Sequence, residues 1–312
     1  MQGKKLWGVD LGGTKIECAI LDANLDTIVR RRIATESAKG YAHLLQRIKK
    51  LVTEIAEEIG EQPSEIGFAT PGVLEPDSMV MKNCNTVCMN GEPMHKDLEH
   101  VLGVPVKLAN DANCFALAET VMGVGREHPN ANVVFGVILG TGVGGGIVVN
   151  NRIIGGKHGL GGEWGHNELE ENGEECYCGK RGCVERVISG PALESYYHSL
   201  SAGELSLSEI DRKYRHDPDP FVSATMERLL ENYGKAISVV LNILDPDLVI
   251  IGGGVGNIDL LYSEGYERIK KYIFNNGKLT TPVCKPALGD SSGVYGAALL
   301  WADPKKYVSQ CL

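Results

Sequence analysis

The 312-residue sequence has no long apolar run and no block of basic residues. No stretch approaches the roughly 20 apolar residues that cross a membrane, and Asp10 follows so soon after Lys4 and Lys5 that the apolar core of a signal peptide is missing. Lys and Arg number 31 against 40 Asp and Glu, a net charge of −9. Without a basic stripe, binding of nucleic acid is not the expected task. We therefore expect a cytoplasmic protein that binds neither membranes nor nucleic acid.

The composition is that of an ordinary globular protein, with 43% hydrophobic and 23% charged residues. Such a chain can bury a large core and is long enough for two domains. It is too long for the nine cysteines to indicate a disulfide framework. Six of them lie scattered in apolar or loop segments and are expected to be unpaired thiols: Cys18, Cys84, Cys88, Cys114, Cys284 and Cys311.

The other three cysteines lie close together in residues 162–185, GEWGHNELEENGEECYCGKRGCVE. Cys176 and Cys178 are one residue apart, which strains a mutual disulfide and lacks the two-residue spacing of redox pairs. The remaining possibilities are a loop with incidental thiols and a metal site. We predict a structural zinc site, because four protein ligands leave no open position for catalysis. Its ligands are His166, Cys176, Cys178 and Cys183, and Gly173, Gly179 and Gly182 let the loop turn back.

Alternating strand and helix patterns along the chain predict the α/β class. Residues 4–22 and 131–154 each have an apolar strand, a Gly/Thr turn and a second apolar strand, so two related halves are expected. Apolar residues at helical spacing predict helices over residues 44–59, 218–244 and 258–274. Because no low-complexity linker is present, the domain boundary is expected near residues 110–120.

Two glycine-rich turns superficially match nucleotide motifs. Gly140, Gly142 and Gly145 have dinucleotide-fold spacing, but a strand follows where that motif requires a helix. Gly8 and Gly13 have Walker spacing, yet a strand follows again and the order Thr14-Lys15 is reversed. Each turn alone is consistent with a plain hairpin. Together with a third glycine turn they favour a phosphate site at these residues: Gly12, Gly13, Thr14, Lys15, Gly140, Thr141, Gly142, Gly253 and Gly254.

In order and spacing, DLGGTK, NDAN, GTGVGGG, EWGH and CYCGKRGCVE resemble the motifs of the ROK (repressor, open reading frame, kinase) family. The segments KNCNTVCMNG, NILDPDLVIIGGG and GDSSGVYGAA are most similar to its manno(fructo)kinase branch. The resemblance implies an actin-like (ribonuclease H-like) two-domain fold with an inter-domain cleft, ATP and Mg²⁺ as cofactors, and a homodimer. We assign residues 1–115 with 292–312 to a small domain and 116–291 to a large domain, with zinc loop 166–183.

Phosphoryl transfer to a sugar hydroxyl needs a carboxylate that orients or deprotonates the hydroxyl. Asp111, at the start of a predicted helix, is the candidate, and an N-cap is its structural alternative. Asp10, at the end of the first strand, is expected to hold Mg²⁺ directly or through water rather than to cap its own turn. Lys15 is expected to serve a phosphate, with a solvated hairpin lysine as the alternative.

Glu163 and Glu185 bracket the zinc loop, and carboxylates accept pairs of sugar hydroxyls. We therefore expect the zinc loop to aim both at one sugar ring, with His166 using one nitrogen for zinc and the other for the sugar or a carboxylate. The alternative is a zinc knuckle that supports a partner surface, with both glutamates solvated. Gly72, Asn85 and Asn110 are expected to complete the sugar site.

The resulting prediction is a kinase that transfers the γ-phosphoryl group of ATP to the 6-hydroxyl of a hexose, with fructose and mannose as substrates. Cys88 stands where the related branch tends to have tryptophan, and the space gained would admit glucose or an N-acetylhexosamine. Glucokinase or N-acetylhexosamine kinase is thus the alternative. A sugar-sensing regulator is the alternative of another class, but Asp10 lies too near the start for a preceding helix-turn-helix, and the chain is acidic. Intact Asp10 and Asp111 also argue against a vestigial zinc module.

Overall fold

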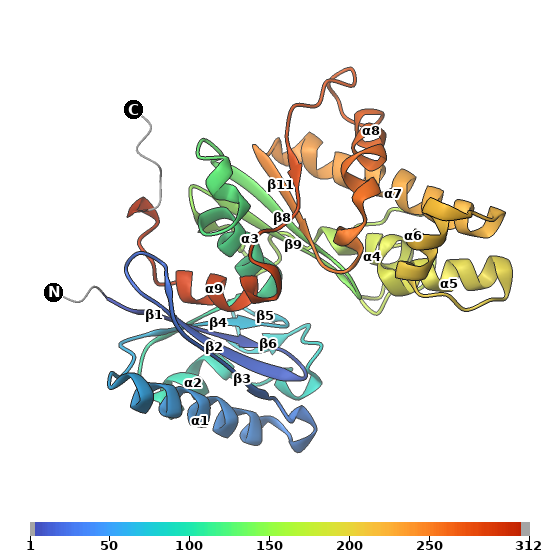
Figure 1. Ribbon diagram of the computed structural model, residues 1–312. Coiled ribbons are helices and arrows are strands. Elements are labelled where there is room, and N and C mark those ends of the chain that lie inside the picture. Colours follow the sequence, from blue (N-terminus) through green and yellow to red (C-terminus); the bar gives the residue numbers. More distant parts are fainter. Residues whose placement is uncertain (1–3, 307–312) are drawn as a thin grey trace. The chain divides into compact units, whose positions relative to one another are not determined.

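The computed structural model describes residues 4–306, so Cys311 and the end of the predicted 292–312 segment lie outside the described residues. Two five-stranded sheets form the framework (Figure 1). The first contains β1 (Leu6–Leu11), β2 (Lys15–Leu21), β3 (Thr27–Ala34), β4 (Ile66–Thr70) and β7 (Val106–Asn110). The second contains β8 (Val133–Leu139), β9 (Val143–Val149), β10 (Arg152–Ile153), β11 (Leu248–Gly252) and β12 (Val283–Cys284).

The strand orders of the two sheets correspond. They are β3-β2-β1-β4-β7 and β10-β9-β8-β11-β12, so in each sheet the first strand in sequence is central and an antiparallel hairpin lies on one side of it. Parallel strands follow on the other side: β4 pairs with β1 and β7 in the first sheet, and β11 pairs with β8 and β12 in the second. The predicted hairpins and the predicted relation between the two halves are confirmed.

The chain divides into two compact units. Unit 1 contains residues 1–129, 146–161 and 288–312, and unit 2 contains residues 130–145 and 162–287. The sequence-based division into a small and a large domain, with boundaries at residues 115 and 292, stays a prediction. Among the described residues, no helix is long and apolar enough to cross a membrane.

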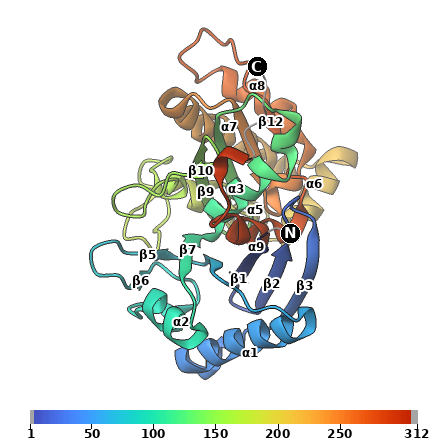
Figure 2. The same cartoon turned by 90° about the vertical axis from the view of Figure 1, so that its left-hand side faces the viewer.

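Helices cover both faces of the first sheet in unit 1 (Figure 1). One face packs against α1 (Tyr41–Ile59), whose apolar stripe includes the fully buried Leu44, Ile48 and Leu51, and against α2 (Met94–Leu102). The other face packs against α9 (Ser292–Leu299), which also contacts α3 (Asp111–Val121). Gly8 makes this packing possible, because a Cβ there would lie 2.2 Å from the Val294 carbonyl oxygen. A short hairpin of β5 (Val73–Leu74) and β6 (Met81–Lys82) lies beside β7 (Figure 2).

The helices of unit 2 pack around the long α7 (Pro220–Leu244), which begins at an Asp219 cap and confirms the predicted helix. The others are α4 (Val184–Ile188), α5 (Gly190–Ser201), α6 (Leu207–His216) and α8 (Glu264–Lys270). The last is shorter than the predicted 258–274. The Tyr262 hydroxyl donates to the carbonyl oxygens of Ile251 and Gly256, at 3.0 and 2.7 Å, and this anchor precedes the start of α8 at Glu264.

Candidate active site

Asp111 begins α3 at the carboxyl end of β7, as predicted. The N-cap is its neighbour Asn110, whose side chain accepts a hydrogen bond from the Ala112 amide at 2.9 Å. Asp111 Oδ1 accepts from the same amide at 2.8 Å. Because Asn110 supplies the cap, an Asp111 carboxylate is not needed to start the helix. Asn110, predicted to contact sugar, therefore has a structural role as well.

Asp10 lies at the end of β1, where Asp111 is a charged neighbour in the same unit. Burial raises the pKa of Asp10 to about 7 from its ordinary 3.8, and the negative charges of Asp111 and Glu17 add to the rise. A Cβ on Gly293 would lie 2.7 Å from Asp10 Oδ2, so a glycine is needed beside this carboxylate. A carboxylate whose ionisation is opposed by burial and by a neighbouring negative charge is well suited to a divalent cation, which favours its charged form.

The turn between β1 and β2 holds Gly12, Gly13, Thr14 and Lys15, the four residues predicted to contact phosphate. The Gly12 amide donates to the Lys15 carbonyl oxygen at 2.9 Å. The Thr35 hydroxyl donates to the Gly12 carbonyl oxygen at 2.7 Å. These bonds fix the turn from outside and leave the exposed Gly13 and Thr14 at its tip.

Gly72 follows β4 in a tightly packed turn. A Cβ there would lie 2.5 Å from Cys84 Sγ, so glycine lets the segment that carries Asn85 approach. The buried Thr70 hydroxyl contacts the carbonyl oxygens of Gly72, at 2.9 Å, and of Ala109, at 3.2 Å. Thr70 thus ties Gly72 to the strand end that carries Asn110 and Asp111. Sequence analysis missed Thr70, although a small hydroxyl residue before Pro-Gly at a strand end was a usable signal.

The predicted metal ligands of unit 2 converge: one ligand atom each from His166, Cys176, Cys178 and Cys183 lies within 4.8 Å of all the others. Cys176 Sγ is 3.5 Å from His166 Nδ1, and Cys178 Sγ is 3.6 Å from Cys183 Sγ. A tetrahedral zinc with bonds of about 2.3 Å to sulfur and 2.0 Å to nitrogen would separate such ligand pairs by roughly 3.5–3.8 Å. The donor set and its spacing therefore fit zinc.

The glycines of this loop have the predicted role. Gly179 and Gly182 adopt positive φ angles of 86° and 62°, and a Cβ on Gly182 would lie 1.8 Å from the Glu170 carbonyl oxygen. The loop is also anchored to α7, where Arg228 binds both oxygens of Glu170 at 2.8 Å. The cluster of four candidate metal ligands is thus fixed in the unit by backbone packing and a bidentate ion pair.

The side chains around the cluster differ in part from the prediction. His166 Nε2, expected to face sugar or a carboxylate, lies 3.0 Å from the hydroxyl of Tyr177, a residue that sequence analysis did not consider. Glu185 Oε2 accepts from the Val143 amide at 2.9 Å, so this glutamate also fixes the Gly140–Gly142 turn. Burial raises the pKa of Glu163, and His166 and Glu185 are its titratable neighbours. Within unit 2, the structure therefore brings Glu163, His166 and Glu185 together.

A cavity of about 460 Å³ in unit 2 joins two of the predicted phosphate turns. Gly140 and Thr141 line it from one turn and Gly254 from the other. The preceding residue, Gly253, has a φ of 85°. Only glycine fits at this position, because a Cβ there would lie 2.4 Å from the Leu139 carbonyl oxygen. Helices α5 and α6 contribute residues that sequence analysis missed: Gly190, Pro191, Glu194, Leu207, Ser208 and Asp211. Ser189-Gly190-Pro191, a helix start, was the available signal.

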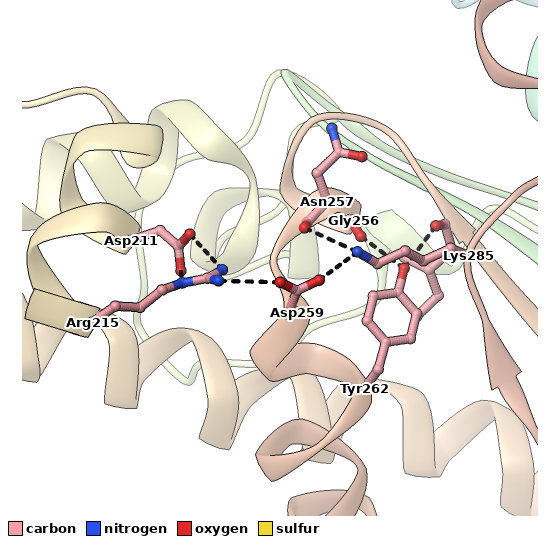
Figure 3. Close-up of polar contacts among 8 residues, drawn as sticks. Asp211, Arg215, Gly256, Asn257, Asp259, Tyr262 and Lys285 are labelled. Atoms are coloured by element: carbon pink, nitrogen blue, oxygen red, sulfur yellow. Dashed lines mark hydrogen bonds and ion pairs between the residues drawn. The ribbon is translucent and has the colours of Figure 1, made fainter.

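A chain of ion pairs links Asp211, Arg215, Asp259 and Lys285 (Figure 3), and Asp211 lines this cavity. Arg215 binds both carboxylate oxygens of Asp211, at 3.2 and 2.8 Å, and reaches Asp259 at 3.1 Å. Asp259 binds Lys285 Nζ at 2.5 Å, and Lys285 donates to the Asn257 carbonyl oxygen at 3.4 Å. Because Asp211 and Asn257 line the cavity, this chain of ion pairs fixes its polar rim.

The predicted site residues thus form one group in each unit. Unit 1 holds Asp10, the Gly12–Lys15 turn, Gly72, Asn85, Asn110 and Asp111. Unit 2 holds the Gly140–Gly142 and Gly253–Gly254 turns, Glu163, Glu185 and the metal ligands. The carboxylates suited to phosphoryl transfer lie in the first group, and the cavity and the metal cluster lie in the second.

Comparisons with known proteins identify the family. Residues 6–304 match the ROK family. An N-acetyl-D-glucosamine kinase of Yersinia enterocolitica is 36% identical over 304 residues, covering 94% of this chain and 98% of that protein. The crystal structure of a ROK hexokinase from Thermus thermophilus matches with a TM-score of 0.84 at 29% identity, covering 95% of this chain and 97% of that one.

A ROK family glucokinase from Streptomyces griseus, solved in complex with glucose and AMPPNP, matches with a TM-score of 0.75 at 26% identity, covering 95% of this chain and 98% of that one. The predicted actin-like fold is therefore confirmed. The chain belongs to the ROK family, and its relatives place it among that family's sugar kinases.

Proposed function

We propose that this protein transfers the γ-phosphoryl group of ATP to the 6-hydroxyl of N-acetylglucosamine. The observation that carries the reaction type is the pair of neighbouring carboxylates, Asp10 and Asp111, in a family of sugar kinases. The relatives carry the choice of sugar, because N-acetyl-D-glucosamine kinases match 94% of the chain at 34–36% identity. They favour the N-acetylhexosamine alternative over the predicted fructose and mannose.

Asp111 acts as the base in this proposal. Asn110 caps α3, so the Asp111 carboxylate can accept the proton of the 6-hydroxyl as the phosphoryl group departs from ATP. Asp10 would hold Mg²⁺, whose charge neutralises the phosphate oxygens during transfer. Asp10 would give up its proton when it holds the cation, because burial favours the neutral carboxyl.

The nucleoside of ATP would occupy the cavity lined by Gly140, Thr141 and Gly254, whose 460 Å³ is in the range of small-molecule sites. Its phosphates would meet the backbone amides of the two glycine turns, with Thr14 and Lys15 of unit 1 as further donors. Glycine at these positions permits close approach of the backbone to the phosphates.

Sugar recognition is assigned to Gly72, Asn85 and Asn110 of unit 1 and to Glu163, His166 and Glu185 of unit 2. In unit 2, the zinc ligands would hold His166 close to both glutamates, which preorganises acceptors for sugar hydroxyls. Because Tyr177 already contacts His166 Nε2, a sugar hydroxyl that used this nitrogen would have to displace the tyrosine. A homodimer, implied by the family resemblance, is part of the proposal.

The test is an ADP-release assay with ATP and Mg²⁺ across N-acetylglucosamine, N-acetylmannosamine, glucose, fructose and mannose. We expect the highest kcat/KM for N-acetylglucosamine, at least tenfold above fructose and mannose. Buried polar groups that pair with an acetamide discriminate strongly against sugars that lack it. A preference for fructose or mannose would instead support the first prediction, and no ADP release with any sugar would favour the sugar-sensing alternative.

A further inference from the structure

A second cavity, of about 390 Å³, lies entirely within unit 1. All five residues of β7, from Val106 to Asn110, line it. Successive side chains of a strand point to opposite faces, so a cavity that touches every residue follows the open edge of the strand. Strand β7 is indeed the last strand of its sheet. At about 3.3 Å per residue, the groove is roughly 13 Å long.

One end of this β7 groove meets the proposed sugar site. Asn110 lines it immediately before Asp111, and Val73 lines it immediately after Gly72. The β5–β6 hairpin that carries Val73 lies beside β7 (Figure 2). The other end is lined by Val106, and His95 of α2 and Leu300 also line the groove. The groove thus starts at residues assigned to the sugar and runs away from them.

The walls between the two ends are mainly apolar, with Val73, Leu74, Leu108 and Ile153 among them. Hexose hydroxyls find no hydrogen-bond partners on apolar walls. Burial of a hydrocarbon chain against such walls is favourable. The volume is within the range of small-molecule pockets and far exceeds the space that one methyl group fills.

The polar groups of the groove suit an amide. Asn113 also lines it, is 5% exposed, and its Oδ1 is buried without a hydrogen-bond partner among the described residues. A buried acceptor without a donor is costly, and the N–H of a 2-acylamino group is a donor that plain hexoses lack.

We propose that the β7 groove binds the acyl chain of 2-acylamino hexoses, and that the enzyme phosphorylates N-acylglucosamines with chains well beyond acetyl. This inference rests on the proposed function, since it takes the sugar to be an N-acylated hexosamine. The sugar ring occupies the site at Asp111 and the acyl chain extends along β7 toward Val106. Each buried methylene lowers KM by at most about fourfold until the chain reaches the end of the groove.

The test measures kcat/KM with ATP and Mg²⁺ for N-acetyl-, N-butanoyl-, N-hexanoyl- and N-octanoylglucosamine, with glucose alongside. We expect kcat/KM to rise from N-acetyl- to N-hexanoylglucosamine. A kcat/KM for N-hexanoylglucosamine below that of N-acetylglucosamine overturns the inference, while the proposed function stands if N-acetylglucosamine still exceeds glucose. If N-acetylglucosamine does not exceed glucose, the proposed function itself fails.

A matched pair of variants on α2 locates the chain. His95→Trp narrows the groove from α2, whereas His100→Trp adds the same ring on the exposed side of the helix, outside the groove. We expect His95→Trp to lower kcat/KM at least fivefold more for N-octanoylglucosamine than for N-acetylglucosamine, and His100→Trp to change neither. Equal rates of His95→Trp and His100→Trp on the octanoyl sugar, with melting temperatures matching wild type, would place the chain elsewhere and overturn the assignment.

Discussion

The two sheets have one strand order but present different chemistry at the ends of their strands. In the first sheet, the central strand β1 carries Asp10 as its next-to-last residue, and β7 leads directly into Asp111. In the second sheet, the central strand β8 leads into Gly140-Thr141-Gly142, and β11 leads into Gly253-Gly254. The first half therefore supplies carboxylates near its strand ends, and the second half supplies small residues.

This difference suggests a division of labour between the halves. Carboxylates can hold a cation and take up a proton, whereas glycine turns let a ligand approach the backbone. The metal cluster belongs to the glycine-bearing unit, where the bond from Glu185 to the Val143 amide links α4, next to Cys183, to the first glycine turn. Unit 1 would carry the chemistry, and unit 2 would position the ligands.

The largest effect is expected for Asp111→Asn. The asparagine keeps the hydrogen bond to the Ala112 amide and the Asn110 cap, but it cannot accept a proton. We expect kcat to fall on the order of 10²-fold or more, with sugar affinity retained. Steady-state rates and calorimetric titration with N-acetylglucosamine separate the two quantities. Near wild-type turnover would move the base to another residue and break the division of labour.

Removal of a metal ligand should lower the stability of the folded protein, and not only the rate of the chemical step. Cys178→Ser takes one of four converging ligands, so we expect about one zinc per chain in wild type and much less in the variant. A loss on the order of 3–4 kcal/mol would lower the melting temperature by about 5 °C. Cys284→Ser, a half-buried thiol of the same unit outside the cluster, is the control. Unchanged metal content and melting temperature in Cys178→Ser would exclude structural zinc.

Sequence patterns predicted much of this arrangement because they are local. A Gly-rich turn between apolar strands specifies a hairpin, and four soft ligands within 18 residues specify their own convergence around a metal. Asp111 was found because it begins a helix directly after a strand and because Asn110-Asp111 matches the family motif NDAN. Each of these features depends on residues close together in the chain.

Features that depend on packing between distant segments were missed. Thr70 matters through the carbonyl oxygens of Gly72 and Ala109, and the second of these is 39 residues away. The start of α8 depends on the hydrogen bonds of Tyr262 to residues before the helix. The cavity walls from α5 and α6 carry no motif, because nearly any side chain of suitable size can line a pocket.

A pair of glycine substitutions separates binding from folding in unit 2. Gly254 has no atom within 4 Å of an added Cβ and lines the cavity, so Gly254→Ala should fold normally and raise KM for ATP about tenfold. Gly253→Ala should lower the melting temperature, because its positive φ and the Leu139 carbonyl oxygen oppose a side chain. Thermal unfolding and ATP titration of both variants would show the contrast. Unchanged KM for ATP in Gly254→Ala would place the nucleotide outside this cavity.

A further effect concerns the pH dependence of stability. Burial, with Asp111 and Glu17 as negative neighbours, raises the pKa of Asp10 to about 7 from 3.8. Between these values the folded protein keeps a proton that the unfolded chain releases, so the contribution of Asp10 to stability is full below about pH 4 and is lost as the pH rises through 7. Melting temperatures without Mg²⁺ should fall from pH 5 to 8 more steeply in wild type than in Asp10→Asn. Parallel profiles would contradict the raised pKa.

The position of the transferred phosphate tests the central claim most directly. Wild-type protein is incubated with ATP, Mg²⁺ and N-acetylglucosamine, and the sugar product is identified by phosphorus and proton NMR. The account predicts N-acetylglucosamine 6-phosphate in amounts equal to the ADP formed. A phosphate on the anomeric oxygen, or ADP formed without any phosphorylated sugar, would contradict it.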